Sequence, residues 1–349
     1  MPRPAIASMS LGRPGIHSLT DKLEEAAKHG FEGIELFYED LEHLARKLSN
    51  TSSSNSSPSR NDLLSAARRV RQLCDSLHLT IICLQPFSFY EGLLSRTQHT
   101  HLLSQKLPLW FSLARILNTT TIQVPSNFLP STLATGDLDI IVSDLRALAD
   151  LGAQKNPPIR FAYEALAWGT HVDTWEASWA IVQRVNRPNF GLCLDTFNIA
   201  GRVYADPASL TGKTATAEAD LAASISRLRR SVDPRKVFYV QVVDGERLSA
   251  PLVEGHKFYV PGQPARMSWS RNARLFVGEE DRGGYLPVME VAQAFLDIGF
   301  DGWVSMELFS RTLADPDPRT PAEHARRGIE SWRKLTRALK LDRQGSGNL

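Results

Sequence analysis

The chain has 349 residues, of which 42% are hydrophobic and 22% charged, so it can bury a large core as one or two globular domains. Its net charge of +2, with both signs interspersed, excludes the basic field that nucleic-acid binding usually needs, and no stretch approaches the roughly 20 apolar residues of a membrane span. The three cysteines have no CxxC or metal-type spacing, so we expect buried free thiols and a soluble, cytoplasmic protein.

Eight apolar runs rich in β-branched residues predict strands, in chain order at 5–11, 33–37, 80–86, 121–125, 159–165, 190–196, 237–243 and 302–308. Apolar residues spaced by three and four predict helices between most of them, at 18–30, 62–77, 137–152, 171–185, 219–230, 287–300 and 321–339. The first helix ends in Gly30, a typical C-cap.

Strand and helix alternate throughout, and eight such units in this length predict an α/β fold, a single (β/α)8 TIM barrel over residues 1–340. A doubly wound open sheet is the main competing fold. No GxGxxG or GxxxxGK[ST] phosphate loop follows any strand, which disfavours that alternative.

Three stretches depart from the regular alternation. Residues 49–60 form a polar, low-complexity loop, and the tail 341–349 is expected to be disordered. Residues 249–286 form an unusually long connection after the seventh strand. A structureless loop of this length is usually functional, so we expect a lid or a subunit contact there, and a homo-oligomer stays open.

Four polar side chains stand at the C-terminal ends of the last four predicted strands: Glu164, Asp195, Gln241 and Glu307. A buried carboxylate is costly unless something pairs with it, and catalytic groups of such barrels project from these strand ends. Two glutamates, one aspartate and one amide offer oxygen ligands only. They predict a site for Mg²⁺ or Mn²⁺, with Co²⁺ as a third candidate and zinc less favoured.

These four residues resemble the ligand set of the xylose-isomerase-like (sugar phosphate isomerase/epimerase) barrels. More specifically, the segments AIASMSLG, GFEGIELFYEDL, ICLQPF, LCLDTFNIAGR and ARMSWSRNARLF are similar to the fungal 3-dehydroshikimate dehydratases of quinate catabolism. The resemblance runs from residue 4 to about residue 335. It implies conversion of 3-dehydroshikimate to protocatechuate and water, with the four residues as metal ligands. The third ligand of the wider superfamily is usually histidine, so Gln241 favours the dehydratase branch over the epimerases.

The dehydration needs a base and a proton donor for the departing hydroxyl, beside a metal that stabilises an enolate. Glu164 and Glu307 are expected to serve catalysis as well as the metal. His171, seven residues after Glu164, is the candidate base, although a local hydrogen bond at a helix start explains it equally well. Many relatives carry a histidine three residues after the aspartate ligand, where this chain has Asn198.

Further residues at the same strand ends are candidate substrate contacts. Arg247 has the spacing of a substrate-binding arginine of related epimerases, and a guanidinium suits a carboxylate. The other candidates are Glu35, with Glu39 near it, Gln85, Tyr90, Asn127 and Asn198.

Three other functions compete with dehydration of this small-molecule substrate. A sugar isomerase or epimerase would share the metal site and use Glu164 and Glu307 as opposed acid and base. An endonuclease-IV-type phosphodiesterase needs several histidines around a metal cluster, which these strand ends lack. A non-catalytic barrel would have no reason to keep four oxygen ligands.

Overall fold

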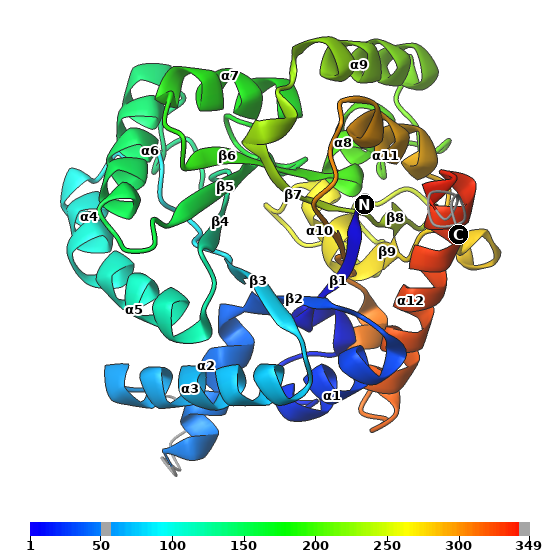
Figure 1. The fold of residues 1–349 in the computed structure, drawn as a ribbon. Coiled ribbons are helices and arrows are strands. Elements are labelled where there is room, and N and C mark those ends of the chain that lie inside the picture. The colour runs from blue at the N-terminus through cyan, green and yellow to red at the C-terminus, as the bar shows by residue number, and fades with distance from the viewer. Residues whose placement is uncertain (50–56, 342–349) are drawn as a thin grey trace, which may run out of the picture.

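Eight parallel strands close into a barrel in the computed structural model, which describes residues 1–49 and 57–341. The strands run in the order β1-β10-β7-β6-β5-β4-β3-β2, and the helices cover the outside of the barrel (Figure 1). The predicted (β/α)8 fold is therefore confirmed. The barrel strands are β1 (Arg3–Ala7), β2 (Gly33–Phe37), β3 (Thr80–Gln85), β4 (Thr121–Pro125), β5 (Arg160–Glu164), β6 (Phe190–Asp195), β7 (Val237–Gln241) and β10 (Trp303–Met306).

Most helices lie where the apolar spacing predicted them. The described α-helices are α1 (Leu19–His29), α2 (Tyr38–Leu48), α3 (Arg60–Ser76), α4 (Arg96–His101), α5 (Leu107–Leu117), α6 (Leu138–Ala153), α7 (Trp175–Val185), α8 (Thr196–Val203), α9 (Ala217–Ser231), α10 (Ala265–Ala273), α11 (Val288–Asp297) and α12 (Thr320–Ala338). Gly30 caps α1 with a φ of 99°, a left-handed conformation that glycine adopts without strain. The sequence did not predict α2, α4, α5, α8 or α10. Of these, α2 and α8 each begin at the residue after a strand, which leaves no loop as a signal.

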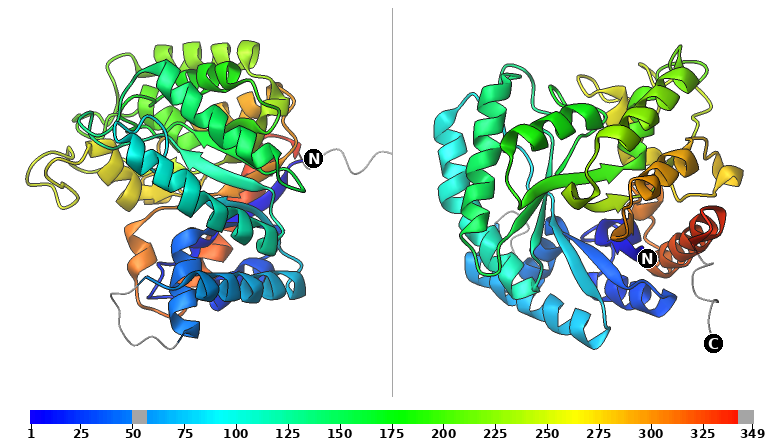
Figure 2. Two further views of the ribbon diagram at one scale, coloured as in Figure 1. Left: turned by 90° about the vertical axis from the view of Figure 1, so that its left-hand side faces the viewer. Right: turned by 45° about the horizontal axis from the view of Figure 1, so that its top comes forward.

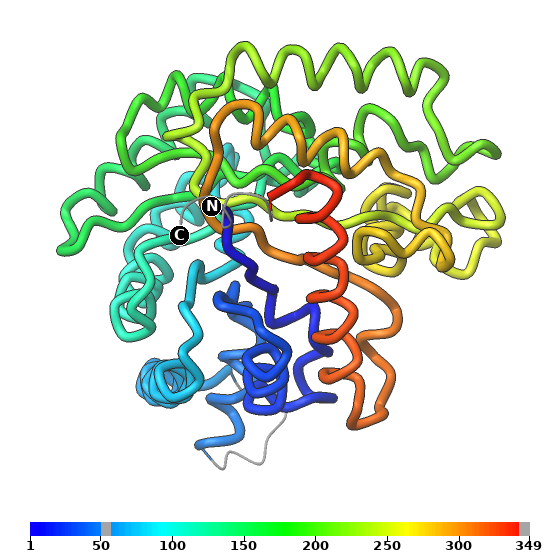
Figure 3. Tube along the Cα trace, turned by 45° about the vertical axis from the view of Figure 1, so that its right-hand side comes forward, coloured from blue at the N-terminus to red at the C-terminus, as the bar shows by residue number. Residues whose placement is uncertain are grey.

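The first and last barrel strands lie side by side and close the barrel. β1 pairs in parallel with β10, and the backbone N–H of Leu308 donates to Ser10 Oγ at 2.7 Å across 298 residues of chain. Figure 3 shows the blue N-terminal segment running beside the orange and red C-terminal part. Closure places the residue after β10 next to the ends of β1 and β7, at the rim where the site lies.

The long connection 249–286 is not structureless, so that prediction was wrong. It contains α10 and the short strand β9 (Arg274–Leu275), which pairs antiparallel with β8 (Asp244–Gly245). A part of it, coloured yellow, stands out from the body of the molecule in the left view of Figure 2. The pairing of β8 with β9 anchors the rest of the connection against the rim of the barrel.

The remaining predictions concern the polar loop, the C-terminal tail, membrane spans, the cysteines and the number of domains. Most of the loop 49–60 and of the tail 341–349 lies outside the described residues. No described helix is both long and apolar enough to cross a membrane. All three cysteines are buried and free. That residues 1–340 form one domain stays a prediction.

Candidate metal centre

Four polar side chains meet at the C-terminal rim of the barrel, as their strand-end positions predicted. Glu164, Asp195 and Gln241 are the last residues of β5, β6 and β7, and Glu307 directly follows β10. Each is at most 3% exposed. Carboxylate oxygens of Glu164, Asp195 and Glu307 lie within 4.8 Å of one another.

One guanidinium contacts this cluster among the described residues, and it comes from the long connection. Arg274, on β9, is 1% exposed and donates from Nη1 to Asp195 Oδ2 at 2.9 Å and to Glu307 Oε2 at 3.1 Å. Its Nε donates to Ser270 Oγ at 3.0 Å, and its guanidinium lies 4.3 Å from the centre of the Phe197 ring. Arg274 therefore supplies one positive charge to three close carboxylates.

Side-chain amides fix the carboxylates from the sides. Asn198 Nδ2 donates to Glu164 Oε1 at 2.8 Å and to Asp195 Oδ2 at 2.9 Å, and its Oδ1 accepts the backbone N–H of Ala167 at 3.0 Å. Gln123, on β4, donates to the other oxygen of Glu164. Asn198 thus orients two of the predicted ligands.

Glu35 adds a fourth carboxylate to the centre. It lies on β2, is fully buried, and accepts at Oε2 from Gln85 Nε2 at 2.7 Å and from Gln241 Nε2 at 3.0 Å. The same two amide nitrogens also donate to Glu307 Oε1, at 3.2 Å from Gln85 and 2.8 Å from Gln241. The predicted contacts Glu35 and Gln85 therefore belong to the network around the carboxylates.

The cluster contains more carboxylates than positive charges, and its acids have raised pKa values. Burial, and then the repulsion of Asp195, raises the pKa of Glu164 to about 8, and burial raises the pKa of Glu35 to about 7. Burial also raises the pKa of Asp195, and raises that of Glu307 well above its usual range even though Arg274 opposes the shift. A divalent cation would reverse these shifts, because it supplies the charge that favours the ionised carboxylates.

The donor set fits such a cation. Gln241 Oε1 is buried and has no hydrogen-bond partner among the described residues. Buried carbonyl oxygens without a partner are uncommon and call for an explanation such as an ion. Three carboxylates and this amide oxygen form a hard, oxygen-only set of the kind that suits Mg²⁺ or Mn²⁺.

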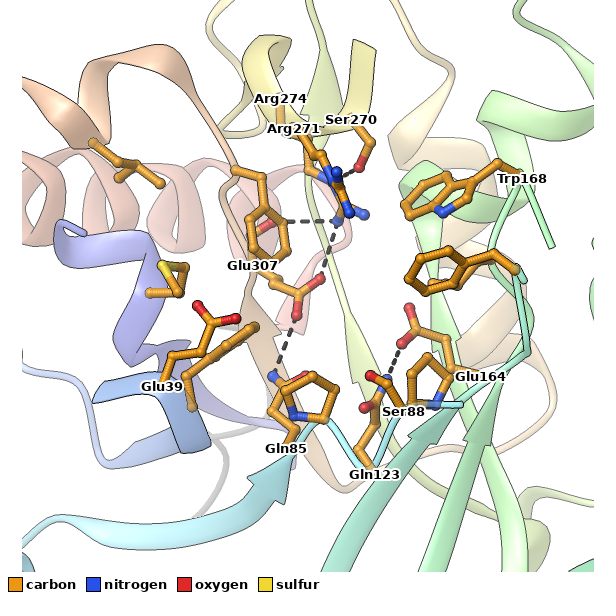
Figure 4. A pocket seen from close by; sticks show the side chains of 18 of the residues that line it. Glu39, Gln85, Ser88, Gln123, Glu164, Trp168, Ser270, Arg271, Arg274 and Glu307 are labelled. Carbon is orange, nitrogen blue, oxygen red and sulfur yellow. Dashed lines mark hydrogen bonds and ion pairs between the residues drawn. The ribbon is translucent and has the colours of Figure 1, made fainter. Parts of the chain in front are cut away.

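A cavity of about 590 Å³ opens above the carboxylates. Glu164, Gln85, Arg274 and Glu307 are among the residues that line it (Figure 4). The other charged residues that line it are Arg13, Glu39 and Arg271. Its aromatic lining residues are Phe37, Phe89, Phe128, Trp168 and Phe309. Such a partly apolar, partly charged pocket suits a small polar molecule with a ring.

Four of the predicted site residues neither line this cavity nor bond the carboxylates beneath it. His171 is exposed, and its Nε2 lies 3.0 Å from the carbonyl oxygen of Ala134. Arg247 is exposed as well, and its side chain lies against Gly212. The structure therefore does not bring the predicted base or the predicted substrate arginine to the carboxylates.

The other two shape loops beneath the surface. The Tyr90 hydroxyl donates to the carbonyl oxygen of Asp144 at 2.8 Å. Asn127 donates from its backbone N–H to Glu91 Oε1 at 2.6 Å and from Nδ2 to the Glu91 carbonyl oxygen at 2.9 Å. Both side chains are committed to holding the loops after β3 and β4.

Sequence reasoning missed three residues of the site. Gln123 had a signal, since it is a polar residue inside the apolar run of β4. Arg271 and Arg274 lie in ARMSWSRNARLF, a segment that carries the family resemblance, but nothing in the spacing of the several arginines of the connection 249–286 singles out these two.

The comparisons with known proteins agree with this geometry. Residues 23–335 match the family model described as xylose isomerase-like TIM barrel. The chain is 55% identical over 343 residues to a 3-dehydroshikimate dehydratase of Neurospora crassa, covering 98% of this chain and 95% of that one. It is 28% identical to a 3-dehydroshikimate dehydratase of Pseudomonas putida, where it covers 98% of this chain but only 43% of the longer relative.

Among solved structures, a xylose isomerase-like TIM barrel/4-hydroxyphenylpyruvate dioxygenase fusion protein is similar, with a TM-score of 0.70 and 26% identity. The match covers 99% of this chain and 45% of the fusion protein, so this chain spans about half of that protein. The family model covers most of the barrel, and the Neurospora relative covers almost all of the chain. The chain belongs to the xylose isomerase-like TIM barrel family.

Proposed function

We propose that this chain is a metal-dependent 3-dehydroshikimate dehydratase, which converts 3-dehydroshikimate to protocatechuate and water. The observation that carries the proposal is the 55% identity to the Neurospora dehydratase over 98% of the chain. The buried carboxylates beneath a cavity of about 590 Å³ support it, because the reaction needs a charge-stabilising site for a small ring ketone.

Glu164, Asp195, Gln241 and Glu307 would hold the cation, Mg²⁺ or Mn²⁺ with Co²⁺ as a third candidate. When bound, the metal supplies a Lewis acid for the ketone of the substrate. The chain's own amides keep the ligands in place, since Gln85 donates to Glu307 and Asn198 to Glu164 and Asp195. Ligands held in this way need no rearrangement during the reaction.

Arg271 is the residue to which we assign the substrate carboxylate. It lines the cavity, and its Nη1 donates to an uncharged partner, Gln263 Oε1, at 3.1 Å. Arg274 is committed to Asp195 and Glu307, and Arg247 lies outside the cavity. A guanidinium with free donors in a half-apolar pocket is suited to a carboxylate.

Glu39 is the residue to which we assign proton transfer. No histidine lines the cavity among the described residues. Of the carboxylates that do, Glu164 and Glu307 serve the metal, so Glu39 is the one left for the substrate. It lies in the first turn of α2. Burial raises its pKa, and the charge of Asp40 adds to this shift.

The geometry supports a simple sequence of proton movements. Glu39 takes a proton from the carbon next to the ketone, and the bond to the β-hydroxyl then breaks. The same proton goes to the departing hydroxyl, which leaves as water, and a proton of the ring methylene then moves to the ketone oxygen, which gives the aromatic ring. Aromatisation of the ring drives the reaction, so no oxidant or organic cofactor is consumed.

The test is an assay with 3-dehydroshikimate, followed by the ultraviolet absorbance of the aromatic product. We expect activity that chelation abolishes and that Mg²⁺ or Mn²⁺ restores, and we expect Glu164→Ala to be inactive. Absence of product in the presence of metal would refute the assignment.

A second pair of variants tests the proton acceptor. Glu39→Gln should lower kcat by about 100-fold or more, the usual contribution of general base catalysis, while metal affinity stays unchanged. Glu42→Gln is the matched control, because Glu42 lies on the same helix and pairs with Arg46 at 2.8 Å. Equal rates in the two variants would remove Glu39 from the mechanism.

A further inference from the structure

Glu35 is a buried carboxylate for which the proposed reaction has no direct use. It is fully buried on β2, and no lysine, arginine or histidine of the described residues forms an ion pair with it. A carboxylate without a counter-charge in such a place is costly. The hydrogen bonds of Glu35 therefore have to offset the cost of burying its carboxylate.

The hydrogen bonds that Glu35 accepts at Oε2 belong to a closed ring of four groups, while its Oε1 is buried and has no hydrogen-bond partner among the described residues. The amide nitrogens of Gln85 and Gln241 each donate to the same two oxygens, Glu35 Oε2 and Glu307 Oε1, over distances from 2.7 to 3.2 Å. A primary amide has two N–H donors, so both hydrogens of each amide are used in the ring.

The ring decides which way Gln241 faces. Because its nitrogen is turned toward Glu35 and Glu307, its Oε1 points away from them, and this buried oxygen has no partner among the described residues. A flipped amide would set Oε1 against two carboxylate oxygens and would lose both hydrogen bonds. A metal needs the oxygen, since an amide NH₂ offers only donors.

We propose that Glu35 is a positioning residue which holds the Gln241 amide so that its oxygen, and not its NH₂ group, faces the metal. This inference rests on the metal site of the proposed function. Glu35 suits the task because an ionised carboxylate only accepts hydrogen bonds, whereas a glutamine there could present either end. Glu307 alone would orient the Gln241 amide less firmly, because its oxygens also bond Arg274 and would bind the metal.

The test measures Mn²⁺ affinity by calorimetric titration of the full chain, independently of turnover. Glu35→Gln should weaken Mn²⁺ binding about 10- to 100-fold, the usual effect of losing a group that orients a ligand. Glu91→Gln is the matched control. Glu91 is also a buried carboxylate without an ion pair at this end of the barrel, but it bonds Asn127 and Tyr163 and none of the ligands. The Mn²⁺ affinity of Glu91→Gln should stay within about threefold of wild type.

Repeating Glu35→Gln in the Gln241→Glu variant separates an effect on amide orientation from a general loss of structure. In Gln241→Glu both ends of the ligand are oxygens, so orientation no longer matters, and the new carboxylate faces Glu35. Adding Glu35→Gln to this variant should strengthen Mn²⁺ binding, the opposite of its effect beside Gln241. A merely structural role of Glu35 would weaken binding by the same factor in both backgrounds.

The outcomes can be told apart. Wild-type protein that binds no Mn²⁺ would overturn the metal site and this inference together. Wild-type binding with an unchanged Glu35→Gln, or with equal losses in both backgrounds, would overturn the inference alone. If Glu35→Gln does not fold, Gln241→Glu decides by itself: its affinity should fall below wild type, because the added charge faces Glu35, and a rise would contradict the role of Glu35.

Discussion

Two buried polar clusters lie near the C-terminal rim of the same barrel, and their charge balance differs. In the first, which we call the Asp40 cluster, Asp40 Oδ1 accepts from Lys22 Nζ at 2.6 Å and Oδ2 accepts from Ser8 Oγ at 2.7 Å. One acid meets one base, and both oxygens are bonded. In the candidate metal centre, four carboxylates lie near one guanidinium, that of Arg274, which bonds only Asp195 and Glu307, and the buried oxygen of Gln241 has no partner among the described residues.

The difference is the one expected between a cluster that stabilises the fold and a cluster that binds a cation. A balanced buried pair can be removed together at little cost, but breaking it leaves a bare charge. A cluster with surplus negative charge is instead unstable by itself and gains from a cation. The two clusters should therefore respond in opposite ways to the same chemical change.

The largest expected effect is on activity when the metal centre loses a carboxylate. Glu164→Gln should lower kcat/KM at least about 1000-fold, equivalent to about 4 kcal/mol, because the metal loses a charged ligand. The rate assay and a Mn²⁺ titration measure it. A loss below tenfold would mean that Glu164 is not a ligand of a catalytic metal.

The next effect is on stability, in the Asp40 cluster. Asp40→Asn should destabilise the fold by about 3 kcal/mol, since the buried Lys22 loses its counter-charge. Urea unfolding measures the loss. Replacing both residues, as Lys22→Met with Asp40→Leu, should cost less than the single change, and a larger loss in the double variant would show that the pair itself is stabilising.

The third effect is the pH dependence of the metal-free protein. The pKa of Glu164 is raised to about 8 from its usual 4.5, so the folded state holds a proton that the unfolded state releases. The stability that this proton contributes is present at low pH and is lost as pH rises through 8. Between pH 6.5 and 8 we expect chelated protein to lose about 2 kcal/mol of unfolding free energy.

Saturating Mn²⁺ should remove this loss, because it favours the ionised carboxylates. Denaturant unfolding at pH 6.5 and 8, with chelator and with Mn²⁺, provides the comparison. Burial lowers the pKa of His324 to about 4, so its titration affects stability below this window and in the opposite sense. A metal-induced gain that shrinks toward pH 8 would contradict the charge surplus of the centre.

The smallest effect comes from an exposed ion pair, which serves as the baseline for both clusters. Arg326 and Glu330 lie one turn apart on α12, 2.9 Å from each other, with about half of each side chain exposed. Glu330→Gln should change the unfolding free energy by no more than about 0.5 kcal/mol. A change above 1 kcal/mol in the same urea experiment would show that exposure is a poor guide to the value of charge pairs here.

The strand ends were predictable from the sequence, and the loops were not. In a closed parallel barrel, strand ends meet at one rim, so Glu164, Asp195, Gln241 and Glu307 could be placed together from their positions alone. The fold followed from the same periodicity. Whether each of these residues binds the metal stays a prediction.

Loop residues could not be placed because their direction depends on distant contacts. The pairing of β8 with β9 sets Gly245 opposite Arg274, which brings Arg274 to the centre and leaves Arg247 outside. Gly245 permits this, since a Cβ there would lie 2.4 Å from the Trp269 ring. No spacing rule encodes a contact between residues about thirty positions apart in an irregular connection. The predicted base His171 lies away from the carboxylates for the same reason, because the loop after β5 turns it toward Ala134.

The pairing of the first strand with the last has a consequence for how the protein is made. β1 finds one of its two neighbours only when β10 has been synthesised, and Glu307 bonds Gln85 across 222 residues of chain. Contacts of such long sequence separation form slowly and late in folding. A nascent chain that ends before Glu307 carries only part of the ligand set and two open sheet edges, which invite aggregation. The four candidate ligands are therefore complete only once β10 and the residue after it have been synthesised.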